Sequence, residues 1–159
     1  MDEERKTIVL NDKEFAKNLE DLLRSSELQP ERFNYRLGLK LHDCSREEGW
    51  VDFLFVSDEW CKNPSGGVHG GIICSLFDTA TGMGAVALTE KNVTTTELSV
   101  SFLKPFNGKE FLFHIEFTSV GRRMIRGIGK AFDRQTGKLC ATSMGSFMII
   151  GERHKALQV

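Results

Sequence analysis

The residues with the clearest chemical potential lie in the stretch from Asn63 to Thr89. A glycine-rich loop leads into an apolar helix, and His69-Gly70-Gly71 stands where the first turn is expected. The first N–H groups of a helix lack an intrahelical partner, and glycines let a carbonyl oxygen approach them closely. Because the helix dipole favours negative charge at this end, the segment predicts a site for an oxygen that gains negative charge.

Asp78 is the only charged residue between His69 and Thr89. A carboxylate in so apolar a helix is costly unless it is hydrogen-bonded or takes part in chemistry. We therefore interpret Asp78 as a catalytic candidate. The alternative is that it caps a neighbouring backbone segment.

The predicted helix has two unlike faces when successive residues are placed about 100° apart. One face is apolar and suits a protein core. The other carries Asp78 among small residues, which allows a second helix or a substrate to come close. The apolar face comprises Ile72, Ile73, Leu76, Ala80, Met83 and Ala87, and the small face comprises Cys74, Ser75, Gly82 and Ala85.

Length and charge exclude several classes of protein. The chain has 159 residues, a net charge of −1 and 27% charged residues. This length predicts one domain, and the charge balance argues against nucleic acid as a partner. We find no run of about eighteen apolar residues, as a membrane span needs, and the first residues, MDEERK, are polar and acidic, unlike a signal sequence. We therefore expect a cytoplasmic protein without membrane association.

Cysteines and histidines give no sign of a metal site. The cysteines form no C-x-x-C pair, which favours reduced thiols with structural roles, and no two histidines are closely spaced. We expect neither a metal nor a separate cofactor. His42 and His114 alternate with apolar residues of predicted strands and are expected at the surface, and His154 lies near the C-terminus. The cysteines are Cys44, Cys61, Cys74 and Cys140.

An amphipathic helix is predicted near the N-terminus, with Asn11 or Asp12 as its cap. Its apolar stripe comprises Phe15, Leu19, Leu22 and Leu23. The polar stretch SSELQPER then ends the helix, and the periodicity changes from that of a helix to that of strands. The predicted division is a helical extension over 1–32, a main domain over 33–151 and a C-terminal tail over 152–159.

Alternating apolar and polar residues predict strands on both sides of the central helix. Two runs precede it and four follow it, with turn-forming residues as hairpin connections. This order predicts an α+β fold, in which an antiparallel sheet of five or six strands wraps around one long helix. The runs are 37–42, 51–55, 98–102, 111–118, 124–133 and 139–150, and the turns are Ser45 to Gly49, Asn107-Gly108, Val120-Gly121 and Thr136-Gly137.

The spacing of these motifs resembles a known family. The pattern comprises Asn63-x5-His69-Gly70-Gly71-x6-Asp78, the segment TTTELSVSFLKP from Thr94 to Pro105, the turn Val120-Gly121-Arg122-Arg123 and the hairpin Thr136-Gly137-Lys138-Leu139. It is similar to the PaaI-like branch of the hotdog-fold acyl-CoA thioesterases. The similarity covers most of the chain beyond the first thirty or so residues, and it implies the hotdog fold and hydrolysis of acyl-CoA thioesters.

The resemblance implies a role for four residues in catalysis. The Gly70 amide and the Asn63 side chain would polarise the thioester carbonyl, and Asp78 would activate water. Direct attack by Asp78, which would form an anhydride, is left open. Relatives carry a hydroxyl on the strand after the helix, and counting from the two ends of the motif selects either Thr95 or Thr96, of which we take Thr95.

The resemblance also implies where the substrate binds. Lys104, Arg122 and Arg123 could pair with the phosphates of coenzyme A, with ordinary solvated surface charge as the alternative. The acyl group would lie against Phe77, Leu76, Met83 or the aromatic residues of the strands. His69 either fixes the loop through a hydrogen bond or transfers a proton. The full set of predicted binding residues is His69, Gly71, Phe77, Phe102, Leu103, Lys104, Pro105, Gly121, Arg122 and Arg123.

One copy of the chain is not expected to form a complete site. Gly70 and Asp78 lie eight residues apart in one helix, and therefore about 12 Å apart along its axis. They cannot serve the same carbonyl, so Asp78 must come from a second copy across a two-fold axis. We expect a homodimer, and a dimer of dimers is left open.

Three other functions fit parts of the pattern. A hotdog hydratase or dehydratase would use a histidine and an acid in a different arrangement. A sensor that binds acyl-CoA without cleaving it would need the cleft but not Asp78, and it would usually carry a basic helix-turn-helix. A purely structural oligomer would need neither Asn63 nor Asp78.

Overall fold

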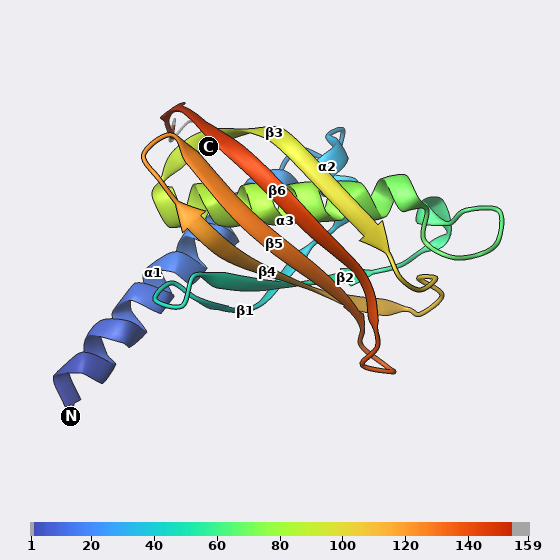
Figure 1. The fold of residues 1–159 in the computed structure, drawn as a ribbon, viewed down its shortest axis with the longest axis horizontal. Coiled ribbons are helices and arrows are strands. Elements are labelled where there is room, and N and C mark those ends of the chain that lie inside the picture. The colour runs from blue at the N-terminus through green and yellow to red at the C-terminus, as the bar shows by residue number, and fades with distance from the viewer. Residues whose placement is uncertain (1, 154–159) are drawn as a thin grey trace.

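The computed structural model describes residues 2–153, with side chains from residue 12 onward. A six-stranded antiparallel sheet in the order β1-β2-β4-β5-β6-β3 curls around one long helix, α3 (Figure 1). The predicted α+β fold is confirmed. The elements are α1 (Asp2–Glu27), α2 (Phe33–Leu37), β1 (Lys40–Ser45), β2 (Trp50–Val56), the short 3-10 helix η1 (Glu59–Cys61), α3 (Gly70–Thr89), β3 (Lys91–Phe102), β4 (Glu110–Val120), β5 (Met124–Asp133) and β6 (Leu139–Glu152).

The core lies between α3 and the inner face of the sheet. The predicted apolar face of α3 is buried, with Leu76 and Ala80 fully enclosed. Phe113 on β4 packs edge-on against Phe77, with 4.9 Å between the ring centroids. Burial of each such aromatic ring stabilises the fold by about 1.5–3 kcal/mol, which holds α3 firmly in the sheet.

Helix α3 is long and apolar enough to cross a membrane by length and composition, which corrects the expectation that no such run exists. Among the described helices it is the one that meets this test, and half of the apolar stretch is buried inside the fold. The core helix of a folded domain has the same composition.

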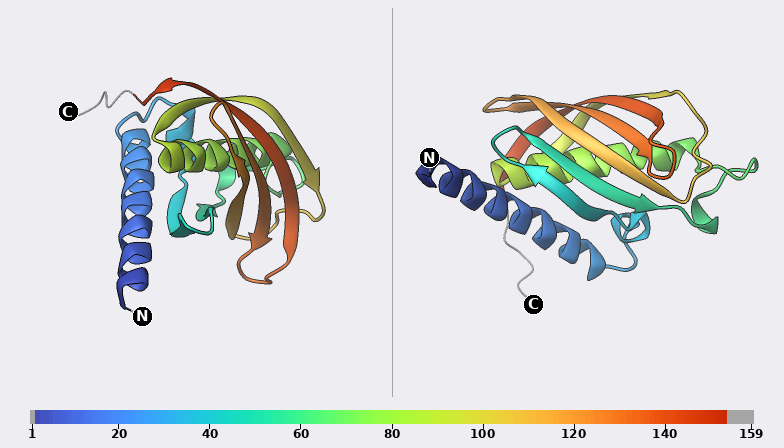
Figure 2. Two further views of the ribbon diagram at one scale, coloured as in Figure 1. Left: turned by 60° about the vertical axis from the view of Figure 1, so that its left-hand side comes forward. Right: turned by 90° about the horizontal axis from the view of Figure 1, so that it is seen from below.

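The N-terminal helix is longer than predicted. It runs through Asn11 and Asp12, so neither residue is its cap, and the Asp12 carboxylate instead accepts a hydrogen bond of 2.7 Å from the Arg46 backbone N–H. Phe15 and Leu19 are fully buried. Figure 2 shows α1 lying beside the C-terminal part of α3, while its N-terminal end projects from the body.

The strand predicted from residue 37 begins later. Leu37 ends the short helix α2, and Gly38 terminates this helix with a φ of 58°, a left-handed conformation that glycine adopts readily. Strand β1 starts only at Lys40. The alternation of Leu37, Leu39 and Leu41 therefore predicts a strand that starts too early, because Leu37 and Leu39 lie before β1.

The connection through Asn107-Gly108 is not a hairpin, in contrast to the prediction. Strand β3 pairs with β6, whereas β4 pairs with β2 and β5, so the chain crosses from one edge of the sheet to its middle after β3. The other three predicted turns do join neighbouring antiparallel strands. Strand β3 is consequently an edge strand of twelve residues.

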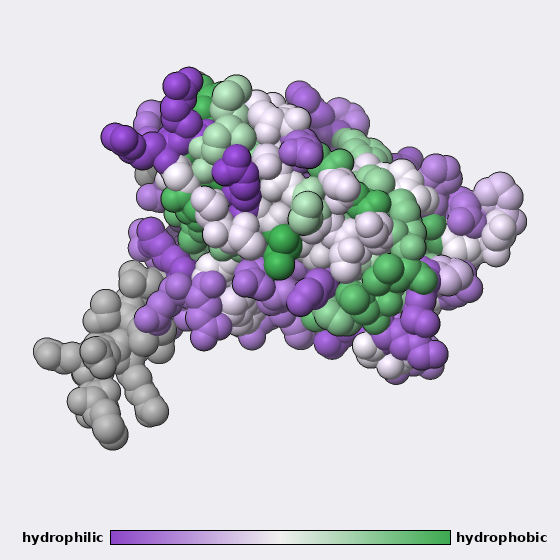
Figure 3. Space-filling model, viewed as in Figure 1, coloured by the Kyte–Doolittle hydropathy of each residue, from purple (hydrophilic) through white to green (hydrophobic). Residues whose placement is uncertain are grey.

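The outer face of the sheet is only moderately polar. Figure 3 shows pale and apolar residues across the strands, with polar residues concentrated towards the edges. Met144, Met148 and Ile150 of β6 are among the exposed apolar side chains. Glu152 ends β6, so the predicted tail begins within a strand, and its residues 154–159, with His154, lie outside the described residues.

Candidate active site

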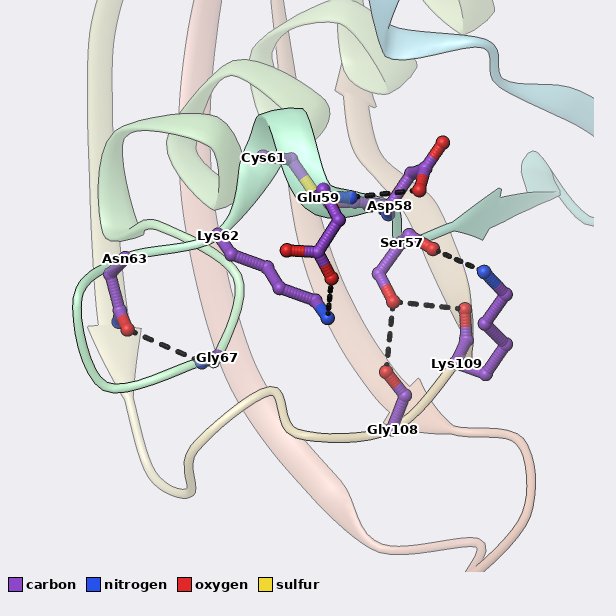
Figure 4. Close-up of polar contacts among 9 residues, drawn as sticks. All are labelled: Ser57, Asp58, Glu59, Cys61, Lys62, Asn63, Gly67, Gly108 and Lys109. Carbon is purple, nitrogen blue, oxygen red and sulfur yellow. Dashed lines mark hydrogen bonds and ion pairs between the residues drawn. The ribbon is translucent and has the colours of Figure 1, made fainter.

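The loop before α3 holds Asn63 in a defined orientation. The Asn63 Oδ1 atom accepts a hydrogen bond of 2.9 Å from the Ser65 backbone N–H and one of 3.2 Å from the Gly67 N–H, and Figure 4 shows the bond to Gly67. Two donors pointing at one atom identify it as the amide oxygen. The Nδ2 amino group has no acceptor among the described residues, and it is therefore free to donate to a ligand.

The first turn of α3 leaves one backbone donor unused. His69 is the N-cap, and its Nδ1 atom accepts a hydrogen bond of 2.9 Å from the Gly71 N–H. The N–H groups of Ile72 and Ile73 both donate to the His69 carbonyl. Within the described part of the chain only the Gly70 N–H of this turn has no partner, and it lies at the positive end of the helix dipole.

Asn63 and Gly70, the residues that carry these donors, line the same cavity, which has a volume of about 470 Å³. Its opposite wall is the segment from Phe102 to Asn107, which includes the predicted residues Leu103, Lys104 and Pro105. The aromatic ring of Phe102 covers Gly70, since a Cβ at Gly70 would lie 3.5 Å from it. The cavity therefore combines two free N–H donors with one cationic side chain.

Buried Ser57 holds the far wall of this cavity in place. Its hydroxyl donates to the carbonyls of Gly108, at 2.9 Å, and Lys109, at 3.3 Å (Figure 4). The Lys109 ammonium group donates back to the Ser57 carbonyl at 2.8 Å. The end of β2 is thereby tied to the connection between β3 and β4, and this positions the segment that carries Lys104.

Asp78 lies in a different cavity, with a volume of about 590 Å³, together with Thr95. The Thr95 hydroxyl donates a hydrogen bond of 2.7 Å to Asp78 Oδ1. Thr96 instead donates to the Ser146 carbonyl at 3.0 Å. A register shift between Thr95 and Glu97 separates the two threonines, so Thr95 is the one that meets the carboxylate.

The remaining predicted residues are not all brought together. Phe77 is fully buried against Phe113 and lines neither of the two cavities, whereas Met83 lines the cavity of Asp78. Gly121 to Arg123 form the exposed turn between β4 and β5. Figure 1 shows this turn near the C-terminal end of α3, away from the loop that precedes the helix.

Two side chains differ from the expected exposure. Ala85 was placed on the open small face but is fully buried with Ile125 and Phe147, because the strands curve over this end of α3. His114 is half-buried rather than at the surface, and its Nδ1 atom lies 2.6 Å from Asp52 Oδ1 on the neighbouring strand. His42 is exposed, as expected.

The four cysteines are free thiols. Burial raises the pKa of Cys44 to about 11, with smaller contributions from the nearby carboxylates of Asp12 and Asp43. Burial also raises the pKa of Cys74 and Cys140. Thiols held in the neutral form are poor nucleophiles, so these three cysteines are unsuited to catalysis. Among the side chains that the structure describes, from residue 12 to 153, no three of His, Cys, Asp or Glu are grouped as a metal site requires.

Sequence reasoning missed one wall of the Asp78 cavity. This wall consists of side chains from the end of α1, the connection after it and the start of α2, among them Leu22, Gln29 and Phe33. Leu22 was assigned only to the core stripe. Helix α2 is a single five-residue turn, and so short a segment shows no recognisable helical period.

Comparisons with known proteins identify a matching family model and similar folds. Residues 65–140 match the family model of the Thioesterase superfamily. In sequence, the chain is 29% identical over 149 residues to "Putative esterase SSO1253" of Saccharolobus solfataricus, which covers 90% of this chain and 97% of that protein.

Two solved structures share the fold. The E. coli PaaI protein from the phenylacetic acid degradation operon has a TM-score of 0.76 at 18% identity, covering 89% of this chain and 97% of its own. A Streptococcus mutans protein, smu.793, bound to acetyl CoA, has a TM-score of 0.66 at 18% identity, covering 73% and 91%.

The resemblance to PaaI-like hotdog thioesterases is thus confirmed. The segment 65–140, which holds α3 and strands β3 to β5, matches the model of the thioesterase superfamily, and the chain has the hotdog fold. This family match and the esterase relative support hydrolysis of an ester or thioester as the general activity.

Proposed function

We propose that the protein hydrolyses acyl-CoA thioesters to a free acid and coenzyme A. The observation that carries this proposal is the presence of two complementary half-sites on one chain. One cavity offers the free Gly70 N–H and the Asn63 amino group, and the other offers the Asp78 carboxylate with its Thr95 partner. A carbonyl needs the first pair and an attacking water needs the second.

In the proposed reaction the thioester oxygen lies between Gly70 N–H and Asn63 Nδ2. Asp78 accepts a proton from water, whose oxygen bonds to the carbonyl carbon, and the negative charge moves to the held oxygen. The carbonyl reforms as the C–S bond breaks, and the thiolate takes up the proton from Asp78. The Thr95 hydroxyl fixes the orientation of the carboxylate throughout. Direct attack by Asp78, followed by hydrolysis of an anhydride, uses the same residues.

The two half-sites meet if two copies of the chain form a dimer. Strand β3 is an edge strand with an unpaired side, and it runs from the Asp78 cavity, at Thr95, to the Gly70 cavity, at Phe102. Antiparallel pairing of two β3 strands, centred between Leu98 and Ser99, would set Thr95 of one copy opposite Phe102 of the other. Each dimer would then carry two complete sites, and assembly into a dimer of dimers would leave them intact.

Coenzyme A is the proposed thiol portion of the substrate. Lys104 lines the Gly70 cavity, and Arg122 and Arg123 are exposed on their turn, available for phosphate groups. In the proposed dimer the turn of one copy comes towards the Lys104 segment of the other. The structurally similar Streptococcus mutans protein was crystallised with acetyl CoA, which supports a ligand of this chemistry.

A panel of acyl-CoA thioesters tests this proposal directly. The purified protein is incubated with acyl groups of increasing length and polarity, and the released thiol is titrated. We expect thiol release that depends on the acyl group and saturates with substrate concentration. Tight binding without thiol release from any acyl-CoA would instead identify a sensor. If sedimentation shows that the active species is a monomer, a site shared between two copies is excluded.

A further inference from the structure

The N-terminal helices contribute a wall to the cavity that contains Asp78 and Thr95. Leu22 and Ser25 from α1, Gln29 from the connection after it, and Phe33 and Asn34 from α2 face α3 and β3 across this cavity. Cavities that bind small ligands commonly have volumes of roughly 300–1,000 Å³. The volume of about 590 Å³ falls within this range.

Apolar side chains face one another across this cavity, among polar ones such as Ser26, Asn34 and Thr79. Met83 and Val86 of α3, Val93 of β3 and Phe147 of β6 face Leu22 and Phe33 on the N-terminal side. Besides Asp78, Arg32 is the one charged side chain in the described lining, and it is largely solvent-exposed at the rim. An apolar group placed between these side chains would lose part of its contact with water.

The wall is held rigidly. Phe15 and Leu19 anchor α1 in the core, and the Asn18 side chain donates to the Ala87 carbonyl of α3 at 3.3 Å. Leu37, buried at the end of α2, fixes the short helix that carries Phe33. Phe33 itself is 50% exposed at the cavity, an unusual place for a large aromatic ring that nothing covers.

We infer that the N-terminal helices form the acyl-binding wall of the site and that Phe33 selects substrates with an extended apolar acyl chain. This inference rests on the proposed thioesterase function. The thiol portion leaves towards Lys104 in the Gly70 cavity, so the acyl chain must extend from the carbonyl in the other direction, along the cavity of Asp78. The wall residues lie outside the segment 65–140 shared with the superfamily, so they can set a preference specific to this chain.

Phe33→Ala tests this assignment, and Tyr35→Ala is its matched control. Both residues are aromatic, lie on α2 and are about equally exposed, at 50% and 45%, but only Phe33 lines the cavity. We expect Phe33→Ala to lower kcat/KM for octanoyl-CoA about tenfold through a higher KM, which is equivalent to about 1.4 kcal/mol of binding. The kcat/KM for acetyl-CoA should stay within about twofold of the wild-type value. Tyr35→Ala should match the wild type throughout.

Ser25→Phe provides a second, opposite test. The larger side chain would fill the cavity from the α1 side, so the preferred acyl chain should become shorter. Wild-type hydrolysis with the same chain-length profile in all three variants would overturn this inference and leave the proposed function intact. If the wild-type protein neither binds nor hydrolyses any acyl-CoA, both this inference and the proposed function are wrong.

Discussion

The Thr95 hydroxyl donates a hydrogen bond of 2.7 Å to Asp78 Oδ1, joining the edge strand β3 to the middle of α3. The bond leaves Asp78 Oδ2 and the second lone pair of Oδ1 available to another donor, such as water. Because α3 is packed into the core and β3 is paired with β6, both partners are held by rigid elements. The carboxylate is therefore preorganised on a half-buried surface next to a cavity.

Asp78→Asn should keep the fold and substrate binding while abolishing most turnover. The amide has nearly the shape of the carboxylate and can still accept the Thr95 hydrogen bond, but it cannot take a proton from water. We expect kcat to fall by about 10²–10⁴ with KM within a few-fold, measured by thiol release. Wild-type turnover in this variant would remove Asp78 from the mechanism.

Thr95→Val and Thr96→Val form a matched pair on β3. Valine preserves shape, so Thr95→Val removes only the hydroxyl that orients Asp78, and kcat should fall about tenfold, equivalent to about 1.4 kcal/mol in the barrier. Thr96→Val removes a bond to the Ser146 carbonyl and should leave kcat unchanged. Equal effects of the two substitutions on kcat would contradict the assigned role of Thr95.

The sequence predicts the parts of this protein where periodicity or spacing is strong. The apolar face of α3 and the inward residues Val51, Phe53 and Phe55 of β2 are buried as predicted, because repeated burial at a fixed period leaves a clear pattern. The family resemblance implies that Asn63 and Gly70 lie in one site, and both residues line the same cavity. Their roles in the reaction stay predictions.

Other features depend on contacts that a linear pattern does not contain. The choice between Thr95 and Thr96 depends on a bulge in β3, which shifts the register by one residue. Asp52 and His114 are 62 residues apart in sequence and meet only through the pairing of β2 with β4. The wall that carries Phe33 needs the docked position of α1 and α2, which no local signal specifies.

Gly70→Ala should reduce rate more than stability or affinity. The new Cβ would lie 3.5 Å from the Phe102 ring, an ordinary contact, so the fold should accept it. The methyl group would crowd the place of the thioester oxygen and weaken its bond to the amide. We expect a loss of about 10²–10³ in kcat with an unchanged unfolding temperature. A wild-type rate would argue against an oxyanion role for this amide.

Alkaline pH should destabilise the fold through Cys44. Its thiol has an ordinary pKa of 9.0 in the unfolded chain, and burial raises this to about 11 in the fold. Above pH 9 the unfolded chain loses the proton first, so a rise in pH favours unfolding. The stabilising contribution is complete below pH 9 and is lost as the pH rises towards 11.

The check on Cys44 is the slope of stability against pH, measured by urea denaturation of the wild type and Cys44→Ala between pH 8 and 11. The variant also loses packing contacts, so only the slopes are compared. We expect the wild type to lose stability more steeply than Cys44→Ala. Parallel slopes would mean that this thiol is not linked to folding.

His69 is predicted to position the Gly70 amide rather than to transfer protons. Its Nδ1 atom accepts the Gly71 N–H bond, so His69→Ala leaves that donor unpaired and should cost about 1 kcal/mol of stability through the lost N-cap. Asparagine is also a good N-cap, since its side-chain oxygen can accept the same bond. His69→Asn should therefore restore both the unfolding free energy and kcat to near wild-type values. If His69 transferred a proton, His69→Asn would be as slow as His69→Ala even with stability restored, and the comparison of kcat with denaturation separates these outcomes.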